Sequence, residues 1–473
     1  MVNVESKDYR VTGALIRAAI ASSLGGLLFG FDTAVIAGTT ASVKSLFQLS
    51  DWAVGFVVSS ALVGTILGAL VSSKPADVWG RRDSLKIMGI LFFVSAVGCA
   101  LAWDFWSLSF ARFIGGIAIG GSSVICPMYI TEIAPAKVRG RLVILFQFNV
   151  CLGILVAYLS NALIESMNLD VLNLQWRVMF ATEALPAVLF FAMLFTIPRS
   201  PRWLMSIRRD NEAEIVLIKM GELRVREAMA EIKDSLKGAF NEVDEKLFQR
   251  KYFYPIFLGV GVAAFNQLSF VNGYLYYLND TLNEIGATFG GKFQPVLVGA
   301  ANVLAVIIAL LSIDKIGRKK LLLIGSWGCA IPLAVCGYIA WTRNLIEVFP
   351  WSVALFILFF SFSQGAVIWV YISEVFPNKV RSKGQALGSF THWGLCAIAA
   401  LVYPAIVASS AVRLAIPFLF GCAMMILQFF VVRFYFIETK GVPLEQLEVQ
   451  LGIKESVDNV RTPLHRTGSD VLK

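Results

Sequence analysis

The stretch GGLLFGFDTAVIAG at residues 25–38 places one carboxylate, Asp32, near the middle of an apolar segment that is long enough for a membrane-spanning helix. A charged side chain in the hydrocarbon core of a bilayer costs about 2.5–3.5 kcal/mol on insertion scales, and residues that bear this cost generally serve substrate or ion pathways. We therefore expect Asp32 to be a functional residue. We expect the rest of the chain to form the membrane protein that surrounds it.

The composition agrees with this expectation. Hydrophobic residues make up 57% of the 473 residues, charged residues make up 15%, and the mean hydropathy is +0.71. Soluble domains are about 45–50% apolar and about 25% charged. One helical crossing takes about 20 residues, so the chain has room for about a dozen. The apolar runs are unbroken and do not alternate as barrel strands would, which predicts an all-α membrane protein.

Twelve apolar segments are expected to span the membrane. The loops that follow even-numbered segments are basic, whereas the opposite loops carry Lys44, Lys292, Arg343 and little else. Because Lys and Arg concentrate in cytoplasmic loops, both termini are expected on the cytoplasmic side. The protein is expected to be a multi-pass protein of the cell (inner) membrane. The segments lie near residues 13–38, 52–73, 85–103, 106–133, 140–163, 176–197, 252–279, 295–313, 321–341, 350–374, 382–408 and 413–437.

An internal repeat divides the chain into two pseudo-symmetric halves of six helices. The string DVWGRR at residues 77–82 is echoed by DKIGRK at 314–319, and EIAPAKVR at 132–139 is echoed by EVFPNKVR at 374–381. The two motifs recur at separations of 237 and 242 residues. Such a repeat predicts a binding site near the bilayer midplane between the halves.

Four regions follow from this repeat. The N-terminal half is expected over 1–197 and the C-terminal half over 252–437. Between them, 198–251 is rich in Lys, Arg and Glu at helical spacing, which predicts short amphipathic cytoplasmic helices against the bundle. The polar tail, 438–473, is expected to be disordered.

Other protein classes are disfavoured. The net charge of +9 comes from short loops and the 198–251 insert and is not accompanied by stacking aromatics, so no nucleic-acid partner is expected. All seven cysteines fall in apolar segments without ligand-like pairing, so neither disulfides nor a metal site is expected. The N-terminus shows no cleavable signal, so the first helix is expected to direct insertion.

Several motifs together resemble the sugar porters of the major facilitator superfamily, in particular the bacterial proton-coupled xylose and hexose symporters. The resemblance covers about residues 10 to 450. It is carried by the first-helix string, the two repeated loop motifs, the polar seventh segment, SPRW at 200–203 and ETKG at 438–441. It implies a twelve-helix major facilitator fold that works by alternating access.

The intramembrane charges Asp32, Arg112 and Glu183 all lie in the first half. By resemblance they are the proton-coupling residues, because proton-coupled members carry Asp, Arg and Glu at these positions whereas passive members tend to carry Asn at the first. Asp32 is expected to take a proton from the outer side and release Arg112 toward Glu183. The alternative is a structural salt bridge.

A neutral sugar requires side chains that both donate and accept hydrogen bonds, and an aromatic plate for its ring face. The resemblance points to six sugar contacts: Gln147, Asn266, Gln267, Asn272, Trp369 and His392. Span eight adds Asn302 as a candidate, and span eleven adds Trp393. Gln364 in span ten is a further polar candidate. Gln267 and Asn272 lie five residues apart on a segment expected to be helical, so both can border one cavity. The alternative is that such amides only join helices.

Acids and arginines at the cytoplasmic ends of neighbouring helices are expected to form a latch. They would pair when this side is closed and separate when it opens. Solvated loop charges are the alternative. The resemblance assigns the latch to Glu132, Arg139, Asp314, Arg318, Glu374 and Arg381.

Five positions depart from the pattern of the family or of its xylose-type members. Arg199 stands where Glu is usual, Phe270 replaces a small Gly, and His392 stands where related symporters usually carry Gln. Asn266 shortens the first amide of the seventh span. Ile154 occupies a position where xylose-type symporters have Gln and glucose-type carriers have Ile, which favours a hexose.

These observations predict a proton-coupled symporter of a monosaccharide of the glucose or xylose type. The expected partners are the sugar, the proton and the lipid bilayer, with no cofactor other than the proton and with the chain as a monomer. A passive uniporter and a non-transporting sugar sensor on the same fold are the alternatives. An enzyme is not expected, because the polar set lacks a nucleophile with its base.

Overall fold

The computed structural model describes residues 10–167, 174–241, 245–287, 293–377, 380–407 and 411–440, together with 442, 447, 449–451 and 453. Most of the tail predicted to be disordered, 438–473, lies outside these residues. The regular elements of the described residues are helical. Twelve helices are long and apolar enough to cross a membrane, and each overlaps one predicted span along most of its length.

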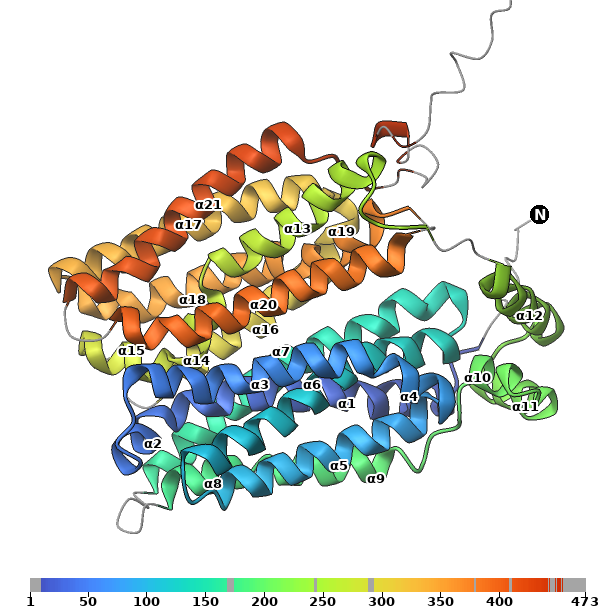
Figure 1. The fold of residues 1–473 in the computed structure, drawn as a ribbon, viewed down its shortest axis with the longest axis horizontal. Helices are drawn as coiled ribbons and strands as arrows, with labels where there is room; N and C mark the ends of the chain where they lie inside the picture. Colours follow the sequence, from blue (N-terminus) through green and yellow to red (C-terminus); the bar gives the residue numbers. More distant parts are fainter. Residues whose placement is uncertain are drawn as a thin grey trace, which may run out of the picture.

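The helices form two bundles joined by a helical linker (Figure 1). The N-terminal half contains α1 (Gly13–Val35), α3 (Asp51–Val71), α5 (Arg81–Ala100), α6 (Phe105–Ile133), α7 (Ala136–Ser166), α8 (Gln175–Ala181) and α9 (Ala184–Met193). The C-terminal half contains α13 (Phe253–Leu268), α14 (Val271–Tyr276), α16 (Gln294–Ile316), α17 (Arg318–Thr342), α18 (Phe349–Phe360), α19 (Ala366–Val375), α20 (Arg381–Val407) and α21 (Ala411–Tyr435).

Shorter elements mark the two ends of the bundle. The end that carries the basic loops, which we call the inner end, has α4 (Ser73–Val78) and the linker helices α10 (Pro201–Ser206), α11 (Asp210–Met220) and α12 (Val225–Asn241). The opposite, outer end has the 3-10 turn η1 (Ile36–Gly38), α2 (Thr40–Leu46) and α15 (Leu278–Ile285).

Side-chain caps begin several spans. The Thr12 hydroxyl accepts from the Leu15 amide at the start of α1, and the Ser50 hydroxyl does the same for Ala53 at the start of α3. Asp104 and Ser107 form a capping box at the start of α6. Such caps satisfy the free amides of the first turn, so the apolar run can begin directly behind them.

The halves meet through two helix pairs, α3 with α20 and α7 with α16. Gly55 of α3 permits the first contact, because a β-carbon there would lie 2.2 Å from the Leu401 carbonyl oxygen of α20. At the outer end α14 and α15 also pack on η1. The two bundles diverge toward the inner end (Figure 1). Contacts between the halves therefore close the outer end.

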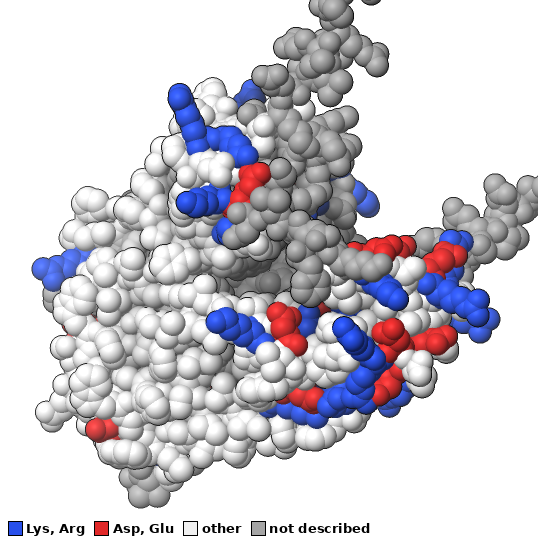
Figure 2. Space-filling model, turned by 45° about the vertical axis from the view of Figure 1, so that its right-hand side comes forward, with Lys and Arg blue, Asp and Glu red and all other residues white. Residues whose placement is uncertain are grey.

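Charged side chains gather at the inner end. Figure 2 shows Lys, Arg, Asp and Glu around a hollow between the two lobes, whereas the neighbouring surface is almost free of charge. Exposed tryptophans, Trp52, Trp103, Trp106 and Trp341, mark the outer ends of α3, α5, α6 and α17. Trp favours the interface between lipid and water, so this ring is consistent with the outer membrane boundary.

Three spans are interrupted inside the membrane. The seventh predicted span, 252–279, is not one helix, because Phe270 has a left-handed backbone (φ 62°) that separates α13 from α14. The sixth is broken at Thr182 and Glu183, between α8 and α9. The tenth contains a π-helical turn, Ser361–Gly365, between α18 and α19. The spans themselves are confirmed, but apolar length does not reveal such local backbone turns.

Candidate functional site

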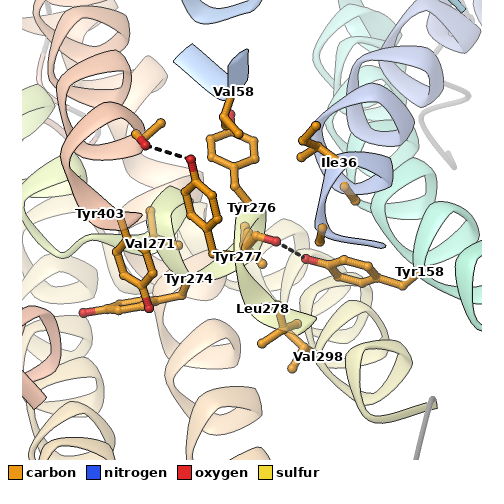
Figure 3. Packing of buried hydrophobic residues seen from close by; sticks show 14 of the residues in the cluster. Ile36, Val58, Tyr158, Val271, Tyr274, Tyr276, Tyr277, Leu278, Val298 and Tyr403 are labelled. Carbon is orange, nitrogen blue, oxygen red and sulfur yellow. Dashed lines mark hydrogen bonds between the residues drawn. The ribbon is translucent and has the colours of Figure 1, made fainter. Parts of the chain in front are cut away.

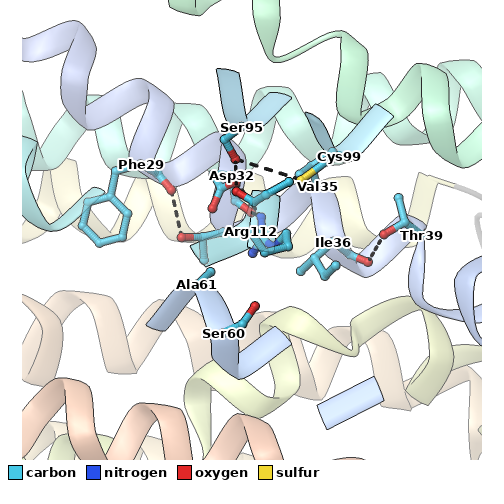
Figure 4. A network of polar contacts seen from close by, with 12 residues as sticks. Phe29, Asp32, Val35, Ile36, Thr39, Ser60, Ala61, Ser95, Cys99 and Arg112 are labelled. Atoms are coloured by element: carbon cyan, nitrogen blue, oxygen red, sulfur yellow. Dashed lines mark hydrogen bonds and ion pairs between the residues drawn. The ribbon is translucent and has the colours of Figure 1, made fainter. Parts of the chain in front are cut away.

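Asp32 and Arg112 form an ion pair in the interior of the N-terminal half (Figure 4). The Arg112 Nη1 donates to Asp32 Oδ1 at 2.5 Å, and each residue is 1% exposed. α1 and α6 supply the two side chains, and Gly115 keeps the space beside them open because a β-carbon there would lie 2.4 Å from Ser95 Oγ. The predicted proximity of Asp32 and Arg112 is present in the structure.

Glu183 lies at the break between α8 and α9 and is also 1% exposed. It is close enough to Asp32 and Arg112 to interact electrostatically with both. Neither of its carboxyl oxygens has a hydrogen-bond partner among the described residues, and the same holds for Asp32 Oδ2 and Arg112 Nε. Two carboxyl groups and one guanidinium thus share one buried site, in which Arg112 is bound to Asp32 and Glu183 is unpaired.

A narrow pocket leads from this site to the other half. Its walls include Phe29 and Asp32 of α1, Arg112 of α6, Tyr276 of α14 and Trp393 of α20. The Phe29 and Trp393 rings lie 5.7 Å apart across the boundary between the halves. The ion pair therefore faces the same space as aromatic side chains of the C-terminal half.

The predicted amides of the seventh span form one hydrogen-bonded network. Gln267 Nε2 donates to Asn266 Oδ1 at 3.0 Å and lies 3.3 and 3.4 Å from the two ring nitrogens of His392. Gln267 Oε1 accepts from Asn272 Nδ2 at 2.9 Å. Gln267 and Asn272 meet across the turn at Phe270, so the geometry that brings them together differs from the continuous helix we expected.

Aromatic rings adjoin this network. The His392 ring lies 5.0 Å from the Trp369 ring and 4.8 Å from the Trp393 ring, measured between centroids. Trp369 is 38% exposed, whereas His392 and Trp393 are buried. An exposed indole next to buried amides offers a flat apolar surface beside hydrogen-bonding groups.

Gln147 and Asn302 lie together at another place on the boundary between the halves. Gln147 Nε2 is 3.9 Å from Cys151 Sγ on α7, and Cys151 Sγ is 3.3 Å from Asn302 Oδ1 on α16. Gln364, in contrast, does not join the predicted contacts. It is fully buried and accepts from Gln428 of α21 at 2.8 Å, so this amide joins two helices of one half.

Tyr276 and Phe29 were not among the predicted site residues. Tyr276 lines the pocket, and its hydroxyl lies 3.9 Å from Cys396 Sγ. Tyr276 follows Asn272 by one helical turn, so its position beside a predicted sugar contact was the available signal. Phe29 precedes Asp32 by three residues and shares its helix face for the same reason.

The inner-end charges form one cluster in each half. In the N-terminal half Glu132 pairs with Arg81 at 3.0 Å and accepts a hydrogen bond from the Ser200 hydroxyl. In the C-terminal half Glu374 pairs with Arg318 at 3.0 Å and accepts from the Thr439 hydroxyl at 2.5 Å. Ser200 and Thr439 are separated by 239 residues, so they extend the internal repeat by a position that sequence comparison missed.

Both ion pairs lie within one half, so they hold the loops of that half together in this structure. The latch stays a prediction. Arg381 donates to the Phe376 carbonyl at 3.2 Å. The side chains of Arg139 and Asp314 lie outside the described part of the chain.

The residues before Ser200 and Thr439 differ in charge. Glu438 accepts from the backbone amides of Arg318 and Lys319 at 2.8 and 3.1 Å, and so caps α17. Arg199 stands at the corresponding place in the other half and pairs with Asp83 of α5 at 3.0 Å. The unusual Arg199 is thus matched by a local acid.

The pattern of the sugar (and other) transporter family matches residues 18–451. The chain belongs to this family. The D-xylose-proton symporter of Escherichia coli (strain K12) is 36% identical, with 91% of this chain and 94% of the relative covered. The arabinose-proton symporter of Bacillus subtilis (strain 168) is 35% identical, with 92% and 95% covered.

Solved structures agree with the sequence relatives. The inward-open conformation of the xylose transporter of E. coli matches with a TM-score of 0.82 at 34% identity, over 92% of this chain and 99% of that one. The same transporter bound to 6-bromo-6-deoxy-D-glucose matches with a TM-score of 0.77 at 34% identity, over 93% and 100%. The chain is therefore a multi-pass membrane protein with the major facilitator fold, as predicted.

Proposed function

We propose that this protein is a proton-coupled monosaccharide symporter of the cell (inner) membrane that works by alternating access. The observation that carries the proposal is the buried Asp32–Arg112 pair on the wall of a pocket that also reaches Tyr276 and Trp393 of the other half. The names of the relatives, D-xylose-proton and arabinose-proton symporters, support the same substrate class.

The charges of the site account for coupling to one proton. With both carboxyl groups ionised, Asp32, Arg112 and Glu183 together carry one net negative charge in a nearly dry interior, which is costly. One proton makes the trio neutral. A proton on Asp32 removes the partner of Arg112, whose guanidinium then turns to Glu183, the nearest unpaired acid. The site thus has two arrangements that differ by one proton and by the position of one arginine.

The amide network accounts for binding of a neutral sugar. In this structure the Gln267 amide contacts Asn266, His392 and Asn272. Sugar hydroxyls both donate and accept, so they can replace these bonds without leaving a buried amide unpaired. Trp369 supplies the apolar plate for the ring face. Gln147 and Asn302 at the boundary of the halves let a bound sugar touch both halves, which links occupancy to their movement.

The driving force is sufficient for accumulation. One elementary charge moved through 100 mV releases about 2.3 kcal/mol, which supports about 50-fold accumulation of a neutral sugar at one proton per sugar. The proposed substrate is a hexose rather than a pentose, because Ile154 stands where xylose-type symporters carry Gln.

Reconstitution tests the proposal. Liposomes with the purified protein receive labelled glucose, xylose or arabinose, with and without a pH gradient and membrane potential. We expect uphill accumulation of at least one sugar only with a gradient. If the internal sugar concentration only ever reaches the external one, with or without a gradient, the protein is a uniporter. If the protein binds sugar but does not transport it, the protein is a sensor. Glu214→Gln, on the exposed face of α11, is the matched control for loss of a carboxylate.

A further inference from the structure

The outer end of the C-terminal half is a rigid unit built on tyrosines. The Tyr274 hydroxyl donates to the Pro417 carbonyl at 2.9 Å. The Tyr277 hydroxyl, shown in Figure 3, donates to the Ala400 carbonyl at 2.9 Å. The Thr281 and Tyr403 hydroxyls lie 3.0 Å apart. These bonds join α14 and α15 to α20 and α21, so the segment moves with its own half.

This unit closes the outer end against the N-terminal half. The Tyr158 hydroxyl of α7 donates to the Leu275 carbonyl of α14 at 2.9 Å, and Tyr158 is fully buried (Figure 3). α14 and α15 also pack on η1. These contacts cross the boundary between the halves, so they must break when the outer end opens.

Asp280 lies on α15 in this closed contact. Its half-buried carboxyl group faces Thr40 and Lys44 of α2, which belong to the other half. Lys44 already pairs with Asp51 of α3 at 2.5 Å. Among the described residues Asp280 forms no ion pair, so it lies at the boundary without a cation of its own.

The other titratable groups near Asp280 do not neutralise it. Tyr277 and Tyr403 of its own half lie close enough to interact with it and carry no charge near neutral pH. Further along α15, Glu284 pairs with Arg343 at 3.7 Å. Burial at the closed contact raises the pKa of Asp280 to about 6, against smaller opposing effects of the Thr40 hydroxyl and Lys44.

We propose that Asp280 is a second proton-binding group, separate from Asp32, and that a proton bound there favours the closed state of the outer end. Opening moves α2 away from α15 and admits water, which relieves the burial and returns the pKa of Asp280 toward its ordinary value of about 4. The closed state therefore binds the proton more tightly than the open state. By linkage, acid must favour closure.

The direction and range follow from these two values. Because the pKa is raised in the closed state, the added preference for closure is complete below about pH 4 and is lost as the pH rises through about 6. A difference of about two pKa units limits the change in the closed-to-open ratio to about 100-fold. Strong external acid would thus hold the outer end closed, although it supplies the protons that drive uptake.

Hydrogen exchange of the full chain in lipid nanodiscs tests this inference without any transport assay. Amides of residues 275–285 are followed between pH 4.5 and 7.5, with rates corrected for intrinsic exchange. We expect protection to increase more than tenfold on acidification in the wild type. Asp280→Asn, which is neutral at every pH, should be protected throughout and show no pH dependence. Asp280→Glu should retain the pH dependence.

Tyr158→Phe is the matched control, because it removes a bond across the same boundary without removing a titratable group. It should lower protection at every pH while keeping the slope of the wild type. A slope in Asp280→Asn equal to that of the wild type would overturn the inference, as would wild-type protection that falls with acid. The same measurements in the Asp32→Asn background, where Asp32 cannot titrate, keep the failure of this inference distinguishable from the failure of the proposed function.

Discussion

The two halves of the protein repeat one helical plan but place different chemistry at its centre. The N-terminal half buries three charged groups, Asp32, Arg112 and Glu183, whereas the C-terminal half buries neutral amides and an imidazole around Gln267. Charges at this depth are costly unless paired, and a change of one proton alters the pairing. Amides can exchange partners with sugar hydroxyls at little cost. In the proposed function, the N-terminal half therefore binds the proton, and the C-terminal half supplies most of the contacts to the sugar.

Asp32→Asn tests this division most severely. The variant keeps the size of the side chain and loses its proton-dependent charge, so we expect gradient-driven accumulation to fall from about 50-fold to equilibration. Exchange of labelled for unlabelled sugar should stay largely intact, because the amide network is untouched. Both are measured in liposomes. Persistent accumulation would remove Asp32 from the coupling site.

Gln267→Ala tests the other half. It removes the residue at which Asn266, Asn272 and His392 meet, and the loss of one or two hydrogen bonds to the sugar should weaken binding about 10- to 100-fold. Titration calorimetry with the transported sugar measures the effect.

The matched control for Gln267 is the buried pair Gln364 and Gln428, which lies in the same half. Replacing both with Leu removes intramembrane amides that only join helices, so sugar affinity should stay within about threefold. If both variants lose affinity equally, the amides of Gln267 act through helix packing and the comparison fails.

The inner-end clusters give a smaller and more graded comparison. The Glu132 side chain is 8% exposed beside Arg81, whereas the Glu374 side chain is 29% exposed beside Arg318. Glu132→Gln breaks the more buried of the two pairs and leaves Arg81 with the exposed Asp77 alone as an acidic partner, so it should cost about 3 kcal/mol of stability. Glu374→Gln should cost about 1–2 kcal/mol, because the Glu374 carboxylate is partly exposed to water, which already weakens its pair with Arg318. Thermal unfolding of the two variants in the same detergent, compared with the wild type, checks the order. A larger loss for Glu374→Gln would contradict it.

The sequence predicted the spans and the repeat because both depend on long-range patterns. Length and hydropathy determine a membrane span, and paired loop motifs reveal a duplicated half. The contact between Asp32 and Arg112 was also predictable, since a buried acid requires a partner and few intramembrane cations exist in the chain.

Local backbone geometry was not predictable. Phe270 adopts a left-handed conformation, which favours Gly. The Gly that is usual at this position in the family was the available signal, and the Phe in this chain conceals it. Gln267 and Asn272 were expected to border one cavity as residues of one helix. They lie together instead because the backbone turns at Phe270 between them. Gln364 was a candidate for the cavity because it is polar. Polarity does not reveal which way a side chain faces on its helix, and Gln428, the partner that decides the role of Gln364, lies 64 residues away. At the inner end, the Glu132 and Glu374 carboxylates accept hydrogen bonds from the hydroxyls of Ser200 and Thr439. These two hydroxyls lie outside the repeated loop motifs.

Proton movement on addition of sugar tests the central claim most directly. Liposomes with the wild-type protein, no imposed gradient and a pH-sensitive dye in the external medium receive the transported sugar. We predict immediate alkalinisation of the medium in the wild type and in Glu214→Gln, and none in Asp32→Asn, although Asp32→Asn still exchanges labelled sugar. Alkalinisation by Asp32→Asn equal to that of the wild type would contradict the claim that the N-terminal half couples the proton through Asp32.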